Sequence, residues 1–156
     1  MDSLFGIKGK DFIMVASEST IMNSIFKLKS HKDKSYQLDD KVLLSVSGQI
    51  SDQDVFGDFI ARNVQYIKFR ESKSLTVQEI ANFTQRELAT AIRKSPVQLQ
   101  SLISGFDDIR GAQLYWLDYL GTMQQVNYGA HGYAAYFVYS ILSSMYKNDL
   151  TIEECV

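Results

Sequence analysis

The stretch that decides the fold is the first one, residues 1–19, "MDSLFGIKGKDFIMVASES". Apolar residues alternate with others over 3–8 and again over 12–17, and the segment between them, Gly9 to Asp11, favours a tight turn. The pattern predicts a β-hairpin that begins almost at the first residue. Chain ends usually fray unless a sheet holds them. We therefore expect the first residues to have a fixed place inside the fold.

Two further strands are expected before the centre of the chain. Apolar and other residues alternate in "SIFKLK" (24–29), and "KVLLSVSG" (41–48) is an apolar run that ends at Gly48. Between them lies "SHKDK" (30–34), whose composition is typical of a polar turn. These segments make the first third of the chain rich in strands.

The period then changes from that of a strand to that of a helix. Apolar residues recur on one face over 52–70, and Ser51 with Asp54 forms a capping-box-like start, in which Asp is a shorter substitute for Glu. A second helix is expected from Thr76, because Glu79 follows three residues later and completes a regular capping box. We expect the two helices to be antiparallel neighbours.

The second half of the chain returns to strands and then to a helix. Three strands are expected, in "VQLQSLISGF" (97–106), "AQLYWLDYLG" (112–121) and "MQQVNYG" (123–129). The segment 131–146 is apolar over most of its circumference, which predicts a buried helix. This order of elements favours an α+β fold in which helices lie outside two antiparallel sheets.

The last residues carry another helix-start signal. In "TIEE" (151–154), Thr151 is a candidate N-cap with Glu154 three residues later, yet the sequence stops at Val156. One turn of helix cannot offset the cost of nucleation. We interpret residues 1–156 as a single, C-terminally incomplete domain; a frayed tail with a chance match is the alternative.

Composition limits the class of protein. With 156 residues, 46% of them hydrophobic and 22% charged, the chain is long enough for one globular domain. A net charge of -2 argues against nucleic acid and anionic membrane as partners, because both favour basic surfaces. The single cysteine, Cys155, excludes an internal disulfide and is typical of a reducing compartment. The first residues do not resemble a signal peptide.

No catalytic or metal-binding motif emerges from the residues alone. The segment "GIKGK" lacks the spacing of a P-loop, and the sequence has no G-x-S-x-G elbow of a serine hydrolase. His31, His131 and Cys155 lack the spacing of metal ligands, so neither metal nor cofactor is expected. For His131, at the start of the expected buried helix, a structural hydrogen bond or a capping role is favoured over catalysis.

A family resemblance adds to this reading. The segments "LFGIKGKDFIMVAS", "KVLLSVSG", "FGDFIARNVQYIKFR", "NFTQRELATAIR", "GAQLYWLDYLGT" and "YGAHGYAAYF" resemble, in order and spacing, the beta subunits of the 20S proteasome. Within that family, "NVQYIKFR" and "YGAHGY" are similar to the non-catalytic fourth member of the beta ring, type-4 in yeast naming and type-2 in mammalian naming. The resemblance implies a four-layer αββα sandwich of the N-terminal-nucleophile hydrolase type, here without its last helix and strands.

The resemblance also assigns site positions. Active beta subunits begin with a threonine whose hydroxyl attacks the scissile carbonyl and whose own amine helps to take the proton. Aligned with the family, this chain has Asp2 at the position of that threonine. The supporting positions hold Glu18 in place of a catalytic aspartate, Lys34 at the lysine that lowers the nucleophile's pKa, Gly48 at the oxyanion glycine and His131 at a serine.

These positions describe a degenerate site. Asp2 carries a carboxylate rather than a hydroxyl, and its amine is blocked unless Met1 is removed. It therefore cannot form the acyl-ester intermediate that the family uses. Because a buried unpaired lysine is costly, we expect Glu18 and Lys34 to form an ion pair that supports the sheet.

The resemblance thus implies a non-catalytic structural beta subunit, needed for ring assembly and for ATP- and ubiquitin-dependent protein degradation by the complex, in the cytoplasm and nucleus. Implied partners are type-3 and type-5 beta subunits, the opposite beta ring, alpha subunits and assembly chaperones, with no nucleic acid or membrane. Two alternatives stay open. One is an active hydrolase with an unconventional nucleophile at Asp2, Ser3 or Cys155, and the other is a free-standing interaction domain of the same fold.

Overall fold

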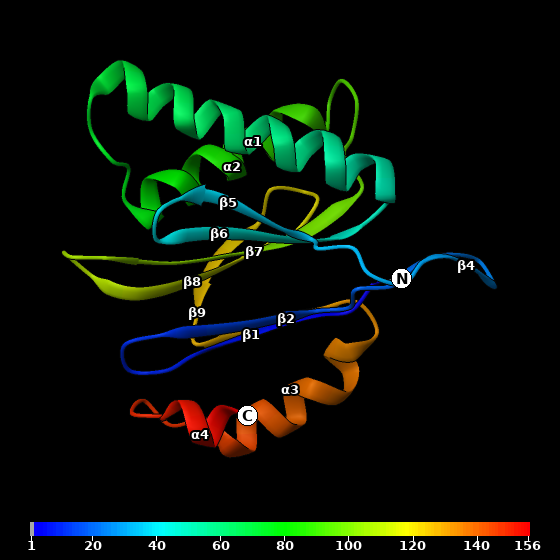
Figure 1. The fold of residues 1–156 in the computed structure, drawn as a ribbon, viewed down its shortest axis with the longest axis vertical. Coiled ribbons are helices and arrows are strands. Elements are labelled where there is room, and N and C mark those ends of the chain that lie inside the picture. Colours follow the sequence, from blue (N-terminus) through cyan, green and yellow to red (C-terminus); the bar gives the residue numbers. More distant parts are fainter. Residues whose placement is uncertain (1) are drawn as a thin grey trace.

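The computed structural model describes residues 2–156, which form four layers (Figure 1). In chain order the elements are β1 Leu4–Lys8, β2 Ile13–Ser17, β3 Ile21–Asn23, β4 Phe26–Lys29, β5 Ser35–Asp39, β6 Val42–Gly48, α1 Ile50–Glu71, α2 Val77–Ala91, β7 Leu99–Asp107, β8 Gly111–Leu117, β9 Met123–Val126, β10 Tyr128–His131, α3 Ala134–Met145 and α4 Ile152–Cys155. Helices α1 and α2 cover a sheet of order β5-β6-β7-β8-β9. A second sheet, β10-β1-β2, lies beneath it, and α3 and α4 lie outside that sheet. The expected α+β sandwich with the layer order αββα is confirmed.

The N-terminal strand lies in the centre of its sheet. Strand β1 pairs antiparallel with β2, with Leu4 opposite Ser17. On its other edge β1 pairs antiparallel with β10, with Leu4 opposite His131. Leu4 is fully buried. The expected hairpin is confirmed, and β1 has a strand neighbour on each side.

The hydrophobic core has two parts. The larger part lies between α1 and α2 and the sheet beneath them, and its residues include Leu44, Val46, Ile60, Val64, Ile80, Leu88, Leu99, Ile103 and Leu117. The smaller part is formed by Leu4, Leu102 and Leu114, which come from both sheets. Alternate residues of β7 enter different parts, because successive side chains of a strand point to opposite faces.

Two strands differ from the sequence-based expectation. Residues 24–29 were expected to form one strand, but residues 21–29 form a separate hairpin of β3 and β4 with Ser24 at a φ of 57°. Strand β5 was missed, because its polar residues Ser35 and Gln37 make the segment look like a continuation of the preceding turn.

The expected strand 123–129 is divided between the two sheets. Strand β9 pairs with β8, whereas β10 pairs with β1. Asn127 lies between them, and its carbonyl accepts a hydrogen bond from the Lys8 backbone N–H at 2.8 Å. This segment therefore passes from one sheet to the other, which alternation along the chain cannot reveal.

Of the two expected capping boxes at the central helices, one is confirmed. The Glu79 backbone N–H donates to Thr76 Oγ1 at 3.2 Å, and the Thr76 N–H donates to Glu79 Oε2 at 2.7 Å. The box expected at Ser51 and Asp54 is wrong. Helix α1 begins at Ile50, and within residues 2–156 its start has no side-chain cap. The Asp54 carboxylate instead accepts hydrogen bonds from Lys32 and Tyr36.

The prediction of a buried helix from residue 131 is wrong in its start and its burial. Strand β10 runs to His131, and Gly132 turns the chain with a φ of 77° before α3 begins. Helix α3, which is described along its whole length, has no buried residue. The apolar pattern of α3 indicates that the helix packs against another surface, but it does not indicate whether that surface belongs to this chain.

The final helix-start signal is confirmed as a local structure. The Thr151 backbone N–H donates to Glu154 Oε2 at 3.1 Å, and the Glu154 N–H donates to Thr151 Oγ1 at 3.4 Å. The helix that follows, α4, is short and carries no buried residue in the part of the chain that the structure describes. No helix within residues 2–156 combines the length and the apolar character needed to cross a membrane.

Candidate functional site

All five site positions predicted by resemblance lie near the beginning of β1. A cavity of about 370 Å³ opens there, beside the end of β6 and the start of β7. Its lining residues are Asp2, Ser47, Gly48, Gln49, Gln98, Leu99, Gln100, Tyr119 and Gly132. Asp2 and Gly48 thus share this cavity, Lys34 contacts Asp2, and His131 immediately precedes Gly132.

The Asp2 carboxylate is bound by two side chains from different layers. Lys34 directly precedes β5, and its Nζ lies 3.0 Å from Asp2 Oδ2. Gln53 Nε2, in the first turns of α1, donates to the same oxygen at 2.6 Å. Gln53 Nε2 also donates to the Gly48 carbonyl at 2.9 Å. One carboxylate oxygen therefore joins β1, β5 and α1.

Lys34 is the most deeply buried cation of the site. Its side chain is only 1% exposed, and its ammonium also donates to the Thr20 carbonyl at 3.0 Å. Taking an ammonium out of water costs several kcal/mol unless an opposite charge and hydrogen bonds compensate it. Asp2 supplies the opposite charge, so the residue that the resemblance aligns with the nucleophile is the counter-ion of Lys34.

The expected ion pair between Glu18 and Lys34 is wrong. Among the described residues, the acidic partner of Lys34 is Asp2. Glu18 follows the end of β2, and its backbone N–H donates to the Ser3 carbonyl at 2.9 Å. Sequence reasoning correctly expected Lys34 to need an anion, but it chose the wrong one because the register of β1 against β2 was unknown.

Gly48 occupies a position that only glycine fits. Its φ is 134°, and an added Cβ would lie 2.4 Å from the Gln98 carbonyl oxygen. The backbone of β6 and the start of β7 therefore approach closely at the edge of the cavity. The geometry explains why glycine stands here; its assignment to an oxyanion position stays a prediction from the resemblance.

His131 is a buried, neutral structural residue. It is 2% exposed, its Nε2 lies 3.0 Å from the Ser101 carbonyl oxygen, and its ring stacks on Trp116 with centroids 4.7 Å apart. Burial lowers the pKa of His131 to about 4, against a smaller opposing effect of the hydrogen bond to Ser101. The predicted structural hydrogen bond is confirmed, whereas the N-cap of α3 is Tyr133 rather than His131.

Two residues of this site were missed by sequence reasoning. Gln53 is buried on the face of α1 that also carries Phe56 and Ile60. A polar residue at an apolar position of an amphipathic helix was the signal that could have found it. Gly132 is the other, because a Cβ there would lie 2.0 Å from the Asp2 carbonyl oxygen.

Cys155, a further candidate nucleophile, is poorly placed for chemistry. Cys155 lies in α4, outside the second sheet, and burial together with the charge of Glu154 raises the pKa of its thiol. A raised pKa reduces the thiolate, which is the reactive form. Within residues 2–156, no group of three His, Cys, Asp or Glu side chains is gathered to hold a metal ion.

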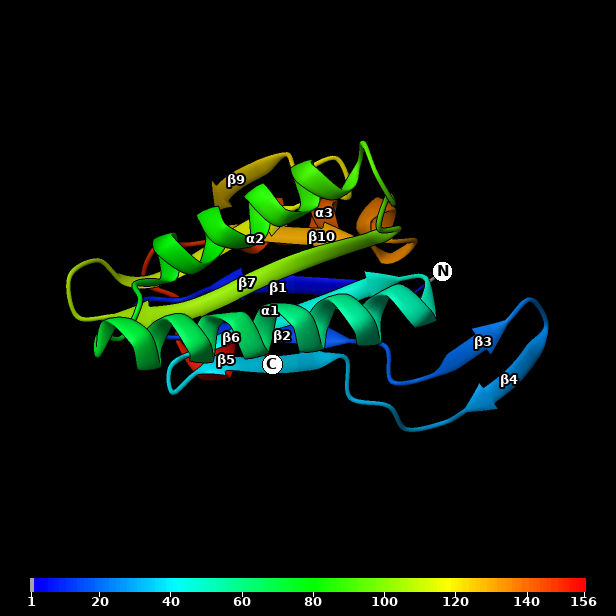
Figure 2. The ribbon, with the colours of Figure 1, turned by 90° about the horizontal axis from the view of Figure 1, so that it is seen from above.

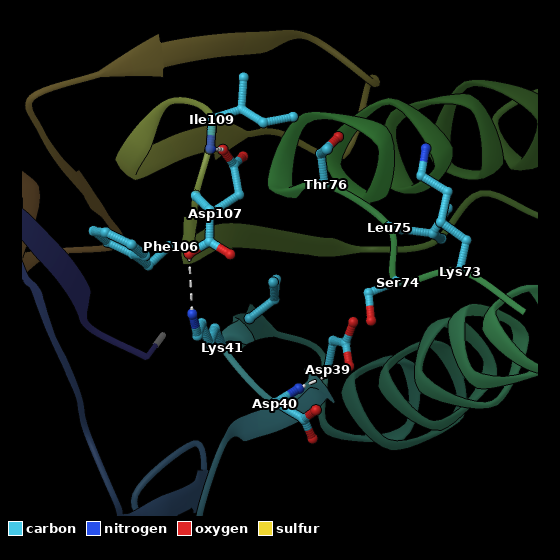
Figure 3. A pocket seen from close by; sticks show the side chains of 12 residues that line it. Asp39, Asp40, Lys41, Lys73, Ser74, Leu75, Thr76, Phe106, Asp107 and Ile109 are labelled. Atoms are coloured by element: carbon cyan, nitrogen blue, oxygen red, sulfur yellow. Dashed lines mark hydrogen bonds and ion pairs between the residues drawn. The ribbon is translucent and has the colours of Figure 1, made fainter.

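A second cavity, of about 320 Å³, lies at the opposite ends of β6 and β7 (Figure 3). It is rich in carboxylates, but the structure pairs them internally. Asp39 Oδ1 binds Lys68 Nζ at 2.5 Å, and Lys41 Nζ lies 3.3 Å from Asp108 Oδ1. Burial opposes ionisation of Asp107, yet hydrogen bonds from the Arg110 backbone and other donors hold its pKa below the usual value. Within residues 2–156, these contacts hold the neighbouring turns and α1 together.

Comparisons with known proteins match this chain over its described length. A family model described as "Proteasome subunit" matches residues 2–156. The chain is 39% identical over 156 residues to proteasome subunit beta type-2-A of Arabidopsis thaliana, an alignment that covers 100% of this chain and 76% of that protein. It is 37% identical over 156 residues to proteasome subunit beta type-4 of Saccharomyces cerevisiae, covering 99% and 79% respectively. The resemblance stated from the sequence, including its type-2 and type-4 character, is confirmed.

Proposed function

Because the chain belongs to the proteasome subunit family, we propose that it is a non-catalytic, structural beta subunit of the 20S core particle. Its role is to complete the beta ring and to help enclose the chamber in which other subunits cleave proteins. Through the complex it takes part in ATP- and ubiquitin-dependent protein degradation. One observation carries the proposal: the carboxylate of Asp2, at the position that the resemblance assigns to the nucleophile, is held by Lys34 and Gln53.

The chemistry of acyl transfer supports the absence of catalysis. A nucleophile of this class needs a hydroxyl or thiol and an adjacent base that takes its proton. Asp2 offers a carboxylate, and that carboxylate is engaged with a buried ammonium. His131 has its Nε2 within hydrogen-bond distance of the Ser101 carbonyl oxygen, so this nitrogen is not directed toward Asp2. An active hydrolase of this class would need a hydroxyl or thiol at the position where this chain holds the Asp2 carboxylate.

Partners and location follow from the same proposal. Type-3 and type-5 beta subunits would lie beside the chain, alpha subunits above it and the opposite beta ring below it, with assembly chaperones acting before the ring closes. A ring requires two different contact faces on each subunit. Exposed apolar residues of α3, among them Phe137 and Ile141, favour such contacts over life as a free-standing domain. The particle would work in the cytoplasm and nucleus.

Native mass spectrometry of the purified particle tests the proposal. A tag on an alpha subunit should recover this chain in the intact particle, with one copy in each beta ring. The matched control is a tag on this chain, which should recover the same particle. A stable monomer or homodimer that never enters the particle would contradict the structural role and favour a free-standing domain.

A further inference from the structure

The β3–β4 hairpin, residues 21–29, is an apolar arm that projects from the four layers (Figure 2). In the described part of the chain its two strands pair only with each other. Ile25 is 82% exposed and Phe26 is 69% exposed, and Met22 and Leu28 are also exposed. An isolated two-stranded hairpin is marginally stable in water, and a cluster of exposed apolar side chains marks an interaction site.

The neck of the hairpin is firmly held. The Lys32 backbone N–H donates to the Ser19 carbonyl at 2.9 Å, and Ser19 Oγ donates to the Ser30 carbonyl at 3.2 Å. Lys34, the counter-ion of Asp2, donates to the Thr20 carbonyl at 3.0 Å. The arm is therefore presented in a fixed direction, which reduces the entropy that binding would cost.

The charges of the hairpin are of one sign. Phe26 and Leu28 alternate along β4 with Lys27 and Lys29, so the apolar pair and the cationic pair lie on opposite faces. No acidic residue occurs from 19 to 32. A surface complementary to this arm offers apolar residues to the face of Phe26 and Leu28, and carboxylates to the lysines on the other face.

We propose that the β3–β4 hairpin docks into an apolar pocket with an acidic rim on a neighbouring proteasome subunit. The inference rests on the proposed function and names one surface through which the chain joins its ring. A second copy of this chain fits less well, because two such arms would bring lysines together. A lipid surface is the other occupant that the test below distinguishes.

Photocrosslinking in the assembled particle tests the contact. The full chain carrying p-benzoylphenylalanine in place of Phe26 is expressed in its own cells, the particle is purified and irradiated, and adducts are mapped by mass spectrometry. We expect one adduct, to a different proteasome subunit. The matched control places the same residue at Ile109, which is 81% exposed in the β7–β8 turn, and should not label that segment.

The acidic rim has a direct chemical test. Carbodiimide joins a lysine amine to a nearby carboxylate as an amide, with loss of water, so it should link Lys27 or Lys29 to Asp or Glu of the same subunit. A double substitution, Phe26→Ser with Leu28→Ser, should lower incorporation into the particle about tenfold, as expected for removal of central apolar anchors. Ile109→Ser should leave incorporation unchanged. Circular dichroism of each variant checks that the fold is intact.

The outcomes separate the two proposals. Adducts only to another copy of this chain, only to lipid, or to nothing in a fully assembled particle would overturn the docking proposal and leave the structural role standing. Normal incorporation of the Phe26→Ser, Leu28→Ser variant into the particle would also overturn the docking proposal and leave the structural role standing. Absence of the unmodified chain from the particle would overturn the proposed function itself.

Discussion

Two regions beside the start of β1 accommodate a titratable group in opposite ways. Around Asp2, a partly exposed carboxylate lies 3.0 Å from the buried ammonium of Lys34 and balances its charge. Around His131, a titratable group is buried as a neutral ring that hydrogen bonds to Ser101 and has a pKa lowered to about 4 by burial. The fold should therefore be destabilised around Asp2 when a charge is removed, and around His131 when the ring gains a proton.

The largest effect is expected from removing the Asp2 charge. Asp2→Ala leaves the Lys34 ammonium buried without its counter-ion, and the free energy of unfolding should fall by about 3–5 kcal/mol. Urea unfolding of the full chain measures it. The double variant Asp2→Ala, Lys34→Met should recover most of the loss, because no charge then remains buried. A single variant as stable as the parent would show that the pair does not hold the strand.

A glycine substitution tests how closely the backbone at Gly132 approaches the backbone at Asp2. Gly132 has a φ of 77°, and a Cβ would lie 2.0 Å from the Asp2 carbonyl oxygen, so Gly132→Ala should cost about 2–4 kcal/mol. Gly111 is the matched control. Its φ is 70°, but a Cβ there would meet only a Phe106 side-chain atom at 3.9 Å. Gly111→Ala should therefore cost only about 1 kcal/mol of backbone strain, and equal losses would contradict the close contact.

The region around His131 should lose stability as the pH falls. Because burial lowers the pKa of His131 to about 4 from 6.5, the unfolded chain binds a proton between these values that the folded chain does not. Stability from this group is complete above about pH 6.5 and is lost as the pH falls toward 4, by about 2–3 kcal/mol.

His131→Phe isolates this effect, since the ring can still stack on Trp116 but cannot titrate. Unfolding curves of both chains across the same pH range give the difference. The parent should lose more stability than the variant on acidification. Parallel curves would show that His131 is not buried in its neutral form.

The smallest change in stability is expected from substitutions of two glutamines of α1, one hydrogen bonded to a carboxylate and the other to a neutral carbonyl. Gln53 Nε2 donates to the Asp2 carboxylate at 2.6 Å, so Gln53→Met should cost about 1 kcal/mol by urea unfolding. On the same helix, Gln65 Nε2 donates to the Leu38 carbonyl at 2.6 Å from an exposed position. Gln65→Met should change stability by about 0.5 kcal/mol or less. The reverse order would indicate that Gln53 does not support the ion pair.

Most local signals in the sequence predicted the local structure, although the capping box at Ser51 and Asp54 was wrong. The capping boxes at Thr76 and Thr151 and the first hairpin depend on residues a few positions apart, and the structure has all three. The family resemblance supplied the layer order. The exposure of α3 and the passage of 123–129 between sheets were not foreseen, because each depends on which distant surface lies opposite.

The same limit applied to the site. Sequence reasoning placed Asp2, Lys34 and Gly48 at site positions, and the structure brings them together around one cavity. It paired Lys34 with Glu18 and not with Asp2, because the anion that reaches a buried ammonium is decided by strand register. The contribution of Gln53 came from a third layer of the fold and required the packing of α1 against the sheets.

The most direct test of the central claim is covalent labelling of the intact particle with an electrophilic proteasome inhibitor, read as the intact mass of every beta subunit. The account predicts that subunits beginning with threonine gain the mass of the inhibitor while this chain stays unmodified. Peptide mapping of Asp2, Ser3 and Cys155 completes the measurement. An adduct on any of these three residues, formed as fast as on the active subunits, would contradict the account and make this chain an enzyme.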